Sequence, residues 1–166
     1  MFFVYDGDSE LVVRGYTDTS FQTDQDDFRS QSGFVFTLNG GAISWKSSKQ
    51  ATVADSTTEA EYIAASEAAK EGVWIRKFVE ELEVVPSSSA HIELYCDNNG
   101  AIAQAKEPRA RQRSKHVLRR HHLTKEIFDR GEMKVCKIRT DSHTADPLTK
   151  PMTHVKHMMH TTSMGL

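Results

Sequence analysis

The sequence predicts an α/β fold in which helices flank a five-stranded mixed sheet, with three antiparallel strands followed by two parallel ones. The first observation is the length of 166 residues, which suits one domain at roughly 100 to 200 residues per domain. The second is the order of expected elements: three strands, a helix, a strand, two helices, a strand and a helix. The third is that each of the last two strands follows a helical segment, as crossovers between parallel strands require.

The first three strands are expected to form a meander. Residues 11–18 (LVVRGYTD) and 33–38 (GFVFTL) are rich in β-branched and aromatic side chains and are bounded by polar clusters. Asn39-Gly40-Gly41 tolerates the positive φ angles of a tight turn. It therefore predicts a hairpin into a third strand over residues 42–46 (AISWK).

The middle of the chain predicts a helix, a strand and a short helix. Residues 57–82 place apolar side chains at close to 3.6-residue intervals, which indicates a long helix, with Gly72 as the point where it would bend or break. Residues 91–96 (HIELYC) alternate in polarity and predict a strand. A short helix is expected over residues 98–106.

The last third of the chain begins with basic segments. Residues 108–113 are expected to form a basic loop, and residues 114–129 a basic helix that Gly131 stops. Residues 133–138 (MKVCKI) predict the fifth strand. The sequence ADPL at residues 145–148 is expected to open a final helix, because proline is favoured in the first helical turn.

Composition excludes several classes of protein. With 38% hydrophobic and 27% charged residues, the chain is expected to be globular and neither disordered nor embedded in a membrane. Its two cysteines lack CxxC spacing, which argues against a disulfide scaffold or a zinc site and favours a reducing compartment. The N-terminus lacks a charged segment followed by an apolar one, so we expect no secretion.

The net charge of −2 conceals a strong asymmetry along the chain. Residues 1–105 carry 7 basic and 17 acidic side chains, whereas residues 106–130 carry 9 basic and 3 acidic ones. Residues 131–166 carry 5 basic and 3 acidic ones. A basic segment beside an acidic body is typical of a surface that binds a polyanion, with a solvated helix face as the alternative at about even odds.

Three aspartates stand at the ends of expected elements. Asp18 ends the first strand, Asp97 ends the fourth strand, and Asp146 starts the final helix. Taken singly, Asp18 is more often a turn former, and the other two are more often helix N-caps.

Two glutamates near the start of the long helix are distinguished by helix capping. Ser56 and Glu59 form a capping box, in which Glu59 reaches back to the backbone and belongs to the helix end. Glu61 lies about one turn before Ala64 and Ala65, on a face of small residues that allows close packing on the sheet. An ionised carboxylate there is costly to bury without a cation, and the alternative is a partly exposed helix residue.

A mixed sheet can bring these strand-end, helix and helix-start carboxylates to one crevice. Converging carboxylates repel one another unless hard cations neutralise them. Oxygen ligands with open positions suit Mg²⁺ or Mn²⁺, and a pair of such ions about 4 Å apart suits phosphodiester hydrolysis.

Six ordered blocks resemble the ribonuclease H domain at the C-terminus of copia-type long-terminal-repeat retrotransposon polyproteins, most closely those of plants. The resemblance covers about residues 10–152. Residues 1–10 then correspond to a remnant of the connection to reverse transcriptase, residues 11–152 to the ribonuclease H domain, and residues 153–166 to a C-terminal tail. The blocks are residues 15–18 (GYTD), 43–47 (ISWKS), 56–64 (STTEAEYIA), 95–98 (YCDN), 114–116 (SKH) with His122, and 145–150 (ADPLTK).

The resemblance implies a ribonuclease H fold and hydrolysis of the RNA strand of RNA/DNA hybrids during reverse transcription, leaving 5′-phosphate and 3′-hydroxyl ends. It places the catalytic, metal-binding carboxylates at Asp18, Glu61, Asp97 and Asp146. It implies two Mg²⁺ ions, with Mn²⁺ as a substitute. Asp18 would bridge both ions, Glu61 and Asp97 would hold the ion facing the leaving 3′-oxygen, and Asp146 would hold the ion that activates water.

The resemblance also implies partners and a location. The partners are the hybrid and the reverse transcriptase domain of the same polyprotein, with no membrane and no small-molecule organic cofactor. The location is a cytoplasmic virus-like particle, with the nucleus as the alternative. The expected nucleic-acid contacts are Ser20, Thr57, Thr58 and Asn98 near the carboxylates, and Arg113, Lys115, His116, Arg119, Arg120 and His122 in the basic segment.

Histidines outside these blocks have weaker assignments. Cellular ribonucleases H place a product-release histidine about ten residues before the last aspartate, whereas His143 stands only three residues before Asp146, so that role stays open. His154, His157 and His160 invite a metal interpretation. Their i, i+3, i+6 spacing drifts around a helix, which favours a polar tail.

Two other functions remain as alternatives. One is a degenerate module that binds the hybrid without cleaving it, and the presence of all four carboxylates counts against it. The other is an integrase-type nuclease on the same scaffold, which would usually have a glutamate on the last helix in place of Asp146.

Overall fold

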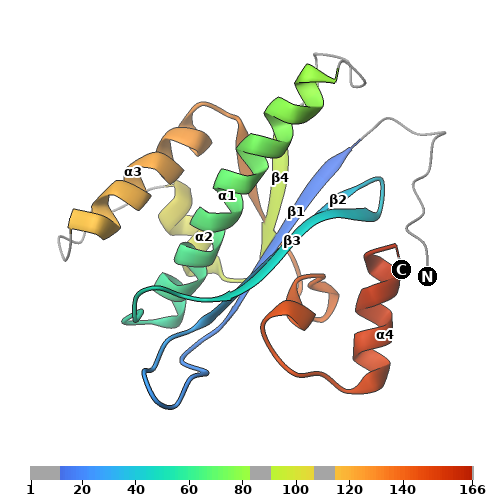
Figure 1. Cartoon of the computed structure of the whole chain (residues 1–166). Coiled ribbons are helices and arrows are strands. Elements are labelled where there is room, and N and C mark those ends of the chain that lie inside the picture. The colour runs from blue at the N-terminus through green and yellow to red at the C-terminus, as the bar shows by residue number, and fades with distance from the viewer. Residues whose placement is uncertain (1–11, 83–90, 107–114, 166) are drawn as a thin grey trace.

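Five strands form one sheet in the order β3-β2-β1-β4-β5 in the computed structural model of the chain, which describes residues 12–82, 91–106 and 115–165 (Figure 1). The pairs β1–β2 and β2–β3 are antiparallel, and the pairs β1–β4 and β4–β5 are parallel. The predicted mixed sheet is therefore confirmed. The strands are β1 (Val13–Ser20), β2 (Gln31–Leu38), β3 (Gly41–Lys49), β4 (Ile92–Cys96) and β5 (Met133–Lys137).

Helices lie on both sides of this sheet (Figure 1). Helix α1 packs across β1, β2 and β4, and α2 and α3 pack beside it near β5. Helix α4 lies on the opposite side of the sheet from α1 (Figure 1). The helices are α1 (Thr57–Glu81), α2 (Asn99–Lys106), α3 (Lys115–Asp129) and α4 (His154–Ser163), with 3₁₀ turns η1 (Thr140–Ser142) and η2 (Asp146–Leu148).

Alternation along β2 builds two separate cores. Phe34 and Phe36 point to the α1 side and belong to the cluster that contains the small residues of that helix. Val35, between them, packs with Ala145 and Met164 on the α4 side. Because successive side chains of a strand point to opposite faces, both faces of the sheet are covered.

Gly72 allows close packing, and α1 runs unbroken through it. A Cβ atom at this position would lie 2.6 Å from the Met133 Sδ atom and 3.2 Å from the Phe36 ring. The expectation that the helix would break at Gly72 was therefore wrong. Side chains from β5 and β2 pack directly against the helix backbone at this position, which leaves no room for a side chain larger than that of glycine.

The final helix begins later than predicted. Residues 146–148 form only the short turn η2, with Pro147 in its first turn, and α4 begins at His154. Pro151 disfavours helical geometry at the residue before it, which separates the two elements. The segment in which we expected a polar tail thus contains a helix, and its His160 and Met164 are buried.

Candidate active site

Asp18 and Asp97 meet because β1 and β4 run parallel. Tyr16 is paired with Tyr95, their rings stack with centroids 5.2 Å apart, and each aspartate follows two residues later. The carboxyl ends of neighbouring parallel strands lie at the same edge of a sheet. Ligand atoms of Asp18, Asp97 and His143 all lie within 4.8 Å of one another.

Helix α1 supplies Glu61 to the same place. Its side chain is buried, and its carboxylate lies within 4.8 Å of ligand atoms of Cys96 and Asp97. Burial, followed by the negative charges of Asp18 and Asp97, raises the pKa of Glu61 from 4.5 to about 9, although the Thr19 backbone N–H donates to it. Of the two interpretations of Glu61, the structure supports the buried carboxylate.

Glu59 has the capping role predicted for it. The Glu59 backbone N–H donates to the Ser56 hydroxyl over 3.2 Å, and the Asp55 backbone N–H donates to the Glu59 carboxylate over 2.7 Å. One amide of the first helical turn and one amide just before the helix are thereby satisfied. Capping therefore separates the two glutamates as the sequence indicated.

Asn98, not Asp97, caps the helix that follows β4. The Ala101 backbone N–H donates to the Asn98 side-chain oxygen over 3.0 Å. The Asp97 carboxylate instead accepts a hydrogen bond of 2.9 Å from the Thr140 hydroxyl. The N-cap interpretation of Asp97 is wrong, and its carboxylate is directed to the site.

Asp146 joins the cluster through a lysine. Its side chain is buried and makes no capping hydrogen bond, so its N-cap interpretation is also wrong. The Lys150 ammonium lies 3.1 Å from the Asp146 carboxylate and 3.7 Å from that of Asp18. The Thr149 hydroxyl donates to the Asp18 carboxylate. The second carboxylate oxygen of Asp146 is buried and has no hydrogen-bond partner among the described residues.

The electrostatics of this cluster favour cations. Burial raises the pKa of Asp18, although the Thr149 hydroxyl and the Lys150 ammonium oppose the shift. Burial alone would lower the pKa of Lys150, but the charges of Asp18 and Asp146 outweigh it and raise that pKa. When all four carboxylates are ionised, one ammonium offsets only one of their charges, and the oxygen donors are those that Mg²⁺ and Mn²⁺ prefer. The residues present therefore fit a site for divalent cations.

Sequence reasoning assigned no role to three contributors to this site, of which only His143 was considered, with its role left open. Thr149 and Lys150 follow Asp146 by three and four residues, a spacing that places side chains on one face of a helical turn and was a usable signal. His143 is fully buried, and its Nδ1 atom accepts a hydrogen bond of 3.3 Å from the Ala145 backbone N–H. Its Nε2 atom has no hydrogen-bond partner in the described part of the chain. Nothing in the local sequence indicated this burial.

The candidate nucleic-acid contacts near the carboxylates lie at the ends of elements. Ser20 ends β1, and Thr57 and Thr58 begin α1. Thr58 lies close to Gly100, where a Cβ atom would approach its hydroxyl to 2.7 Å. Asn98 uses its side-chain oxygen as a helix cap. The contacts of these four residues with nucleic acid remain predictions.

The basic segment is described only in part. Arg113 lies outside the described residues. Lys115, His116, Arg119 and Arg120 belong to α3, but their side chains lie outside the described part. His122 is exposed on the same helix. The assignment of this segment to nucleic-acid binding stays a prediction.

Two curated relatives are plant transposon polyproteins. The chain is 43% identical over 144 residues to the retrovirus-related Pol polyprotein from transposon TNT 1-94 of Nicotiana tabacum. This match covers 87% of this chain and 11% of the relative. It is 33% identical over 156 residues to the Pol polyprotein from transposon RE2 of Arabidopsis thaliana, covering 94% of this chain and 11% of the relative. The chain thus spans about a tenth of the length of these relatives. No protein-family model matches it.

Solved structures establish the fold. The N-terminal RNase H domain of rv2228c from Mycobacterium tuberculosis has a TM-score of 0.58 at 11% identity, covering 93% of this chain and 99% of that one. LC11-RNase H1, solved in complex with an RNA/DNA hybrid, has a TM-score of 0.57 at 16% identity. The match covers 82% of this chain and 93% of that one. Among the described residues, no helix is both long and apolar enough to cross a membrane. The chain therefore belongs to the Pol polyproteins of copia-type plant retrotransposons, as a segment that has the ribonuclease H fold.

Proposed function

We propose that this domain hydrolyses the RNA strand of RNA/DNA hybrids. The observation that carries the proposal is the convergence of Asp18, Glu61 and Asp97 from three separate elements, with the pKa of Glu61 raised to about 9. A fold that buries like charges together without function loses stability, whereas a site for divalent cations requires them. The fold supports the proposal, because a neighbour of the same fold was solved with an RNA/DNA hybrid.

The four carboxylates would hold two Mg²⁺ ions, for which Mn²⁺ would substitute. Asp18 would contribute to both ions, because it lies within 4.8 Å of a ligand atom of Asp97 and shares the Lys150 ammonium with Asp146. Glu61 and Asp97 would hold one ion and Asp146 the other. When bound, the ions would lower the pKa of the attacking water and offset charge on the leaving 3′-oxygen.

The remaining residues would orient these ligands and the substrate. The Thr140 and Thr149 hydroxyls donate to Asp97 and Asp18 and so fix the directions of those carboxylates. Contacts to 2′-hydroxyl groups and to the shape of the hybrid groove would select RNA. The basic segment would bind the phosphate backbone of the hybrid. The reverse transcriptase domain of the same polyprotein would supply the hybrid inside a virus-like particle.

A cleavage assay on the 166-residue chain tests the proposal. With a hybrid labelled on the RNA strand and Mg²⁺ present, we expect products with 5′-phosphate and 3′-hydroxyl ends. Asp97→Asn should abolish cleavage and leave hybrid binding unchanged or stronger, because it removes one charge from the ligand set. Glu59→Gln, two residues from Glu61 but in the capping box, is the control and should cleave normally.

Three results would contradict the proposal. Cleavage by Asp97→Asn at the wild-type rate would refute the assignment of the carboxylates as catalytic metal ligands. Binding of the hybrid by the wild type without cleavage at any Mg²⁺ or Mn²⁺ concentration would indicate the non-cleaving module. Cleavage of duplex DNA in preference to hybrid RNA would indicate the integrase-type nuclease.

A further inference from the structure

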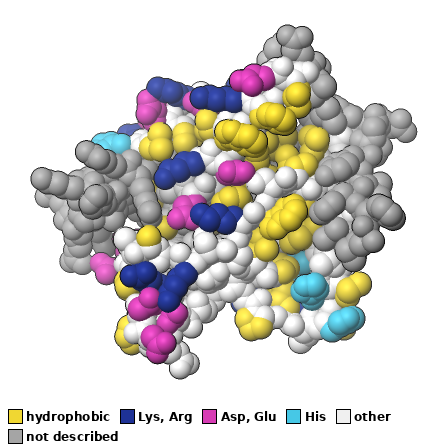
Figure 2. Space-filling model, viewed as in Figure 1, with side chains coloured by type: hydrophobic (Ala, Val, Ile, Leu, Met, Phe, Trp, Pro, Cys, Tyr) yellow, Lys and Arg dark blue, Asp and Glu magenta, His cyan; other side chains and the backbone are white. Residues whose placement is uncertain are grey.

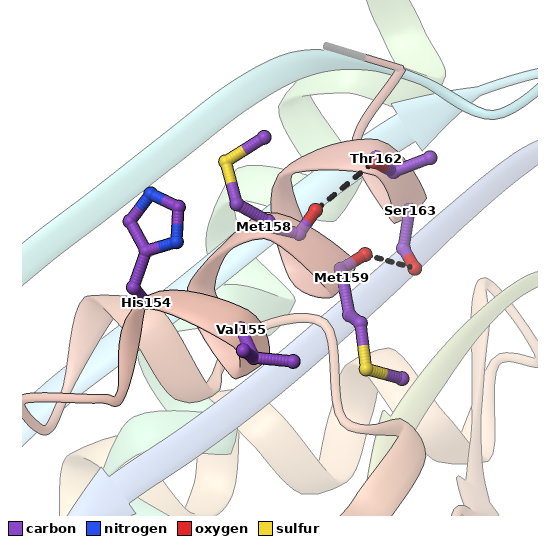
Figure 3. Close-up of a pocket in the computed structure, with 6 residues that line it drawn as sticks. All are labelled: His154, Val155, Met158, Met159, Thr162 and Ser163. Atoms are coloured by element: carbon purple, nitrogen blue, oxygen red, sulfur yellow. Dashed lines mark hydrogen bonds between the residues drawn. The ribbon is translucent and has the colours of Figure 1, made fainter.

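A hollow of about 560 Å³ runs along one side of α4 (Figure 3). Every described residue that lines it belongs to this one helix. A helix is a convex cylinder, so a second surface is needed to close such a hollow. The lining residues, called here the apolar face of α4, are His154, Val155, Met158, Met159, Thr162 and Ser163.

This face is apolar and open. The exposed fractions of Val155, Met158 and Met159 are 70%, 48% and 63%. The Thr162 and Ser163 hydroxyls each donate over 3.0 Å to a carbonyl of the helix itself (Figure 3), so they offer few hydrogen bonds to a partner. Figure 2 shows hydrophobic and histidine side chains gathered where α4 lies. Contiguous exposed apolar side chains mark an interaction surface, and methionine adapts well to a partner's shape.

The described body of the protein holds α4 mainly by its C-terminal end. Met164 and His160 are buried, and the Ala42 backbone N–H donates to the Met164 carbonyl over 2.9 Å. All the side chains from His154 to Met159 are exposed. The first half of the helix is therefore left uncovered by the described residues.

The segment of residues 1–11 joins the described structure beside this helix. Val12 and Asn39 are hydrogen-bonded in both directions, over 2.8 and 3.2 Å. Gly165 packs on the same turn, where a Cβ atom on it would lie 2.9 Å from the Gly40 carbonyl oxygen. Eleven residues reach up to about 36 Å when extended, whereas the 10 residues of α4 span about 15 Å. Any turn of α4 is therefore within reach of the segment.

The chemistry of the two partners matches. Residues 1–5 (MFFVY) are apolar, and residues 6–10 (DGDSE) carry three acidic side chains and no basic one. Helix α4 carries Lys156 and no acidic side chain. We propose that residues 1–11 of this chain dock along the apolar face of α4, with Phe2 and Phe3 in the hollow. The polypeptide that enters β1 is then fixed on the side of the sheet opposite α1.

Disulfide trapping tests the contact directly. In the 166-residue chain with Cys136→Ser, the pair Phe3→Cys and Met159→Cys should oxidise to an intramolecular disulfide, seen as a faster band on a non-reducing gel. The pair Phe3→Cys and Lys77→Cys, with its second cysteine on α1, is the control and should stay reduced. A disulfide-linked dimer from the first pair would show that a second copy covers α4, and would overturn the proposal.

Hydrogen exchange provides a second readout that does not depend on cross-linking. Phe2→Ser with Phe3→Ser should speed hydrogen exchange of the α4 amides about tenfold or more, because the two phenylalanines would no longer pack on the helix. Exchange of the sheet amides should not change, because the packing of the sheet is not altered. Asp6→Ser with Asp8→Ser is the matched control and should have a much smaller effect. Unchanged α4 protection in the phenylalanine variant, or an equal loss in both variants, would overturn the proposal.

Discussion

Glu61→Gln offers the sharpest test of the site, because it replaces the ionisable carboxyl group with an amide of nearly the same shape. The amide oxygen of glutamine can still accept the Thr19 N–H that Glu61 accepts. Glutamine cannot ionise, so the variant folds without taking up the proton that Glu61 must regain when the chain folds near pH 7. We therefore expect it to be more stable than the wild type when no divalent cation is present.

The size and sign of the effect follow from the shifted pKa. In the folded chain the pKa of Glu61 is raised from 4.5 to about 9, so between these values the folded state keeps a proton that the unfolded state has released. Stability then falls as pH rises, by about 1.4 kcal/mol per unit. At pH 7, about 2.5 units above the lower value, the loss of unfolding free energy is about 3.5 kcal/mol. Below pH 4.5 both states are protonated, and the loss disappears.

Urea unfolding in EDTA at pH 6, 7 and 8 measures this loss. The difference in unfolding free energy between Glu61→Gln and the wild type should grow by about 1.4 kcal/mol for each pH unit. Glu59→Gln keeps the capping box, so its unfolding free energy should change with pH in the same way as that of the wild type. Adding Mn²⁺ should stabilise the wild type but much less the Glu61→Gln variant. A difference that stays constant from pH 6 to pH 8 would refute the buried, proton-holding carboxylate.

Three further predictions concern packing, substrate grip and the internal cation. Gly72→Val should lower the unfolding free energy by roughly 1 to 3 kcal/mol or more, because a Cβ atom would meet Met133 at 2.6 Å; equal midpoints in urea would contradict this packing. Arg119→Glu with Arg120→Glu should weaken hybrid binding and flatten its dependence on salt, whereas an unchanged salt slope would favour a solvated face. Lys150→Met should destabilise the metal-free chain at pH 7 and enlarge the stabilisation by Mn²⁺, since Asp18 and its neighbours lose their ammonium; identical Mn²⁺ effects on both chains would contradict that role.

The sequence by itself determined the strand and helix order and the separation of Glu59 from Glu61. Both depend on interactions within a few residues: side-chain periodicity in the first case and the capping box from Ser56 in the second. The four carboxylates were also proposed as ligands from the sequence, because the resemblance rests on the blocks that contain them. The side chains of most of the basic segment lie outside the described residues, so its role stays a prediction.

Only the tertiary structure decided how these carboxylates are surrounded. Asn98 takes the helix cap and leaves Asp97 to accept from Thr140, a choice that neighbouring residues in the sequence left open. Thr149 reaches Asp18 across 131 positions of the chain, and Lys150 joins Asp18 to Asp146. Such contacts depend on how the whole sheet and its helices pack. Periodicity and capping are local and can be read from a few residues, whereas the electric field at a buried carboxylate sums over every element packed around it.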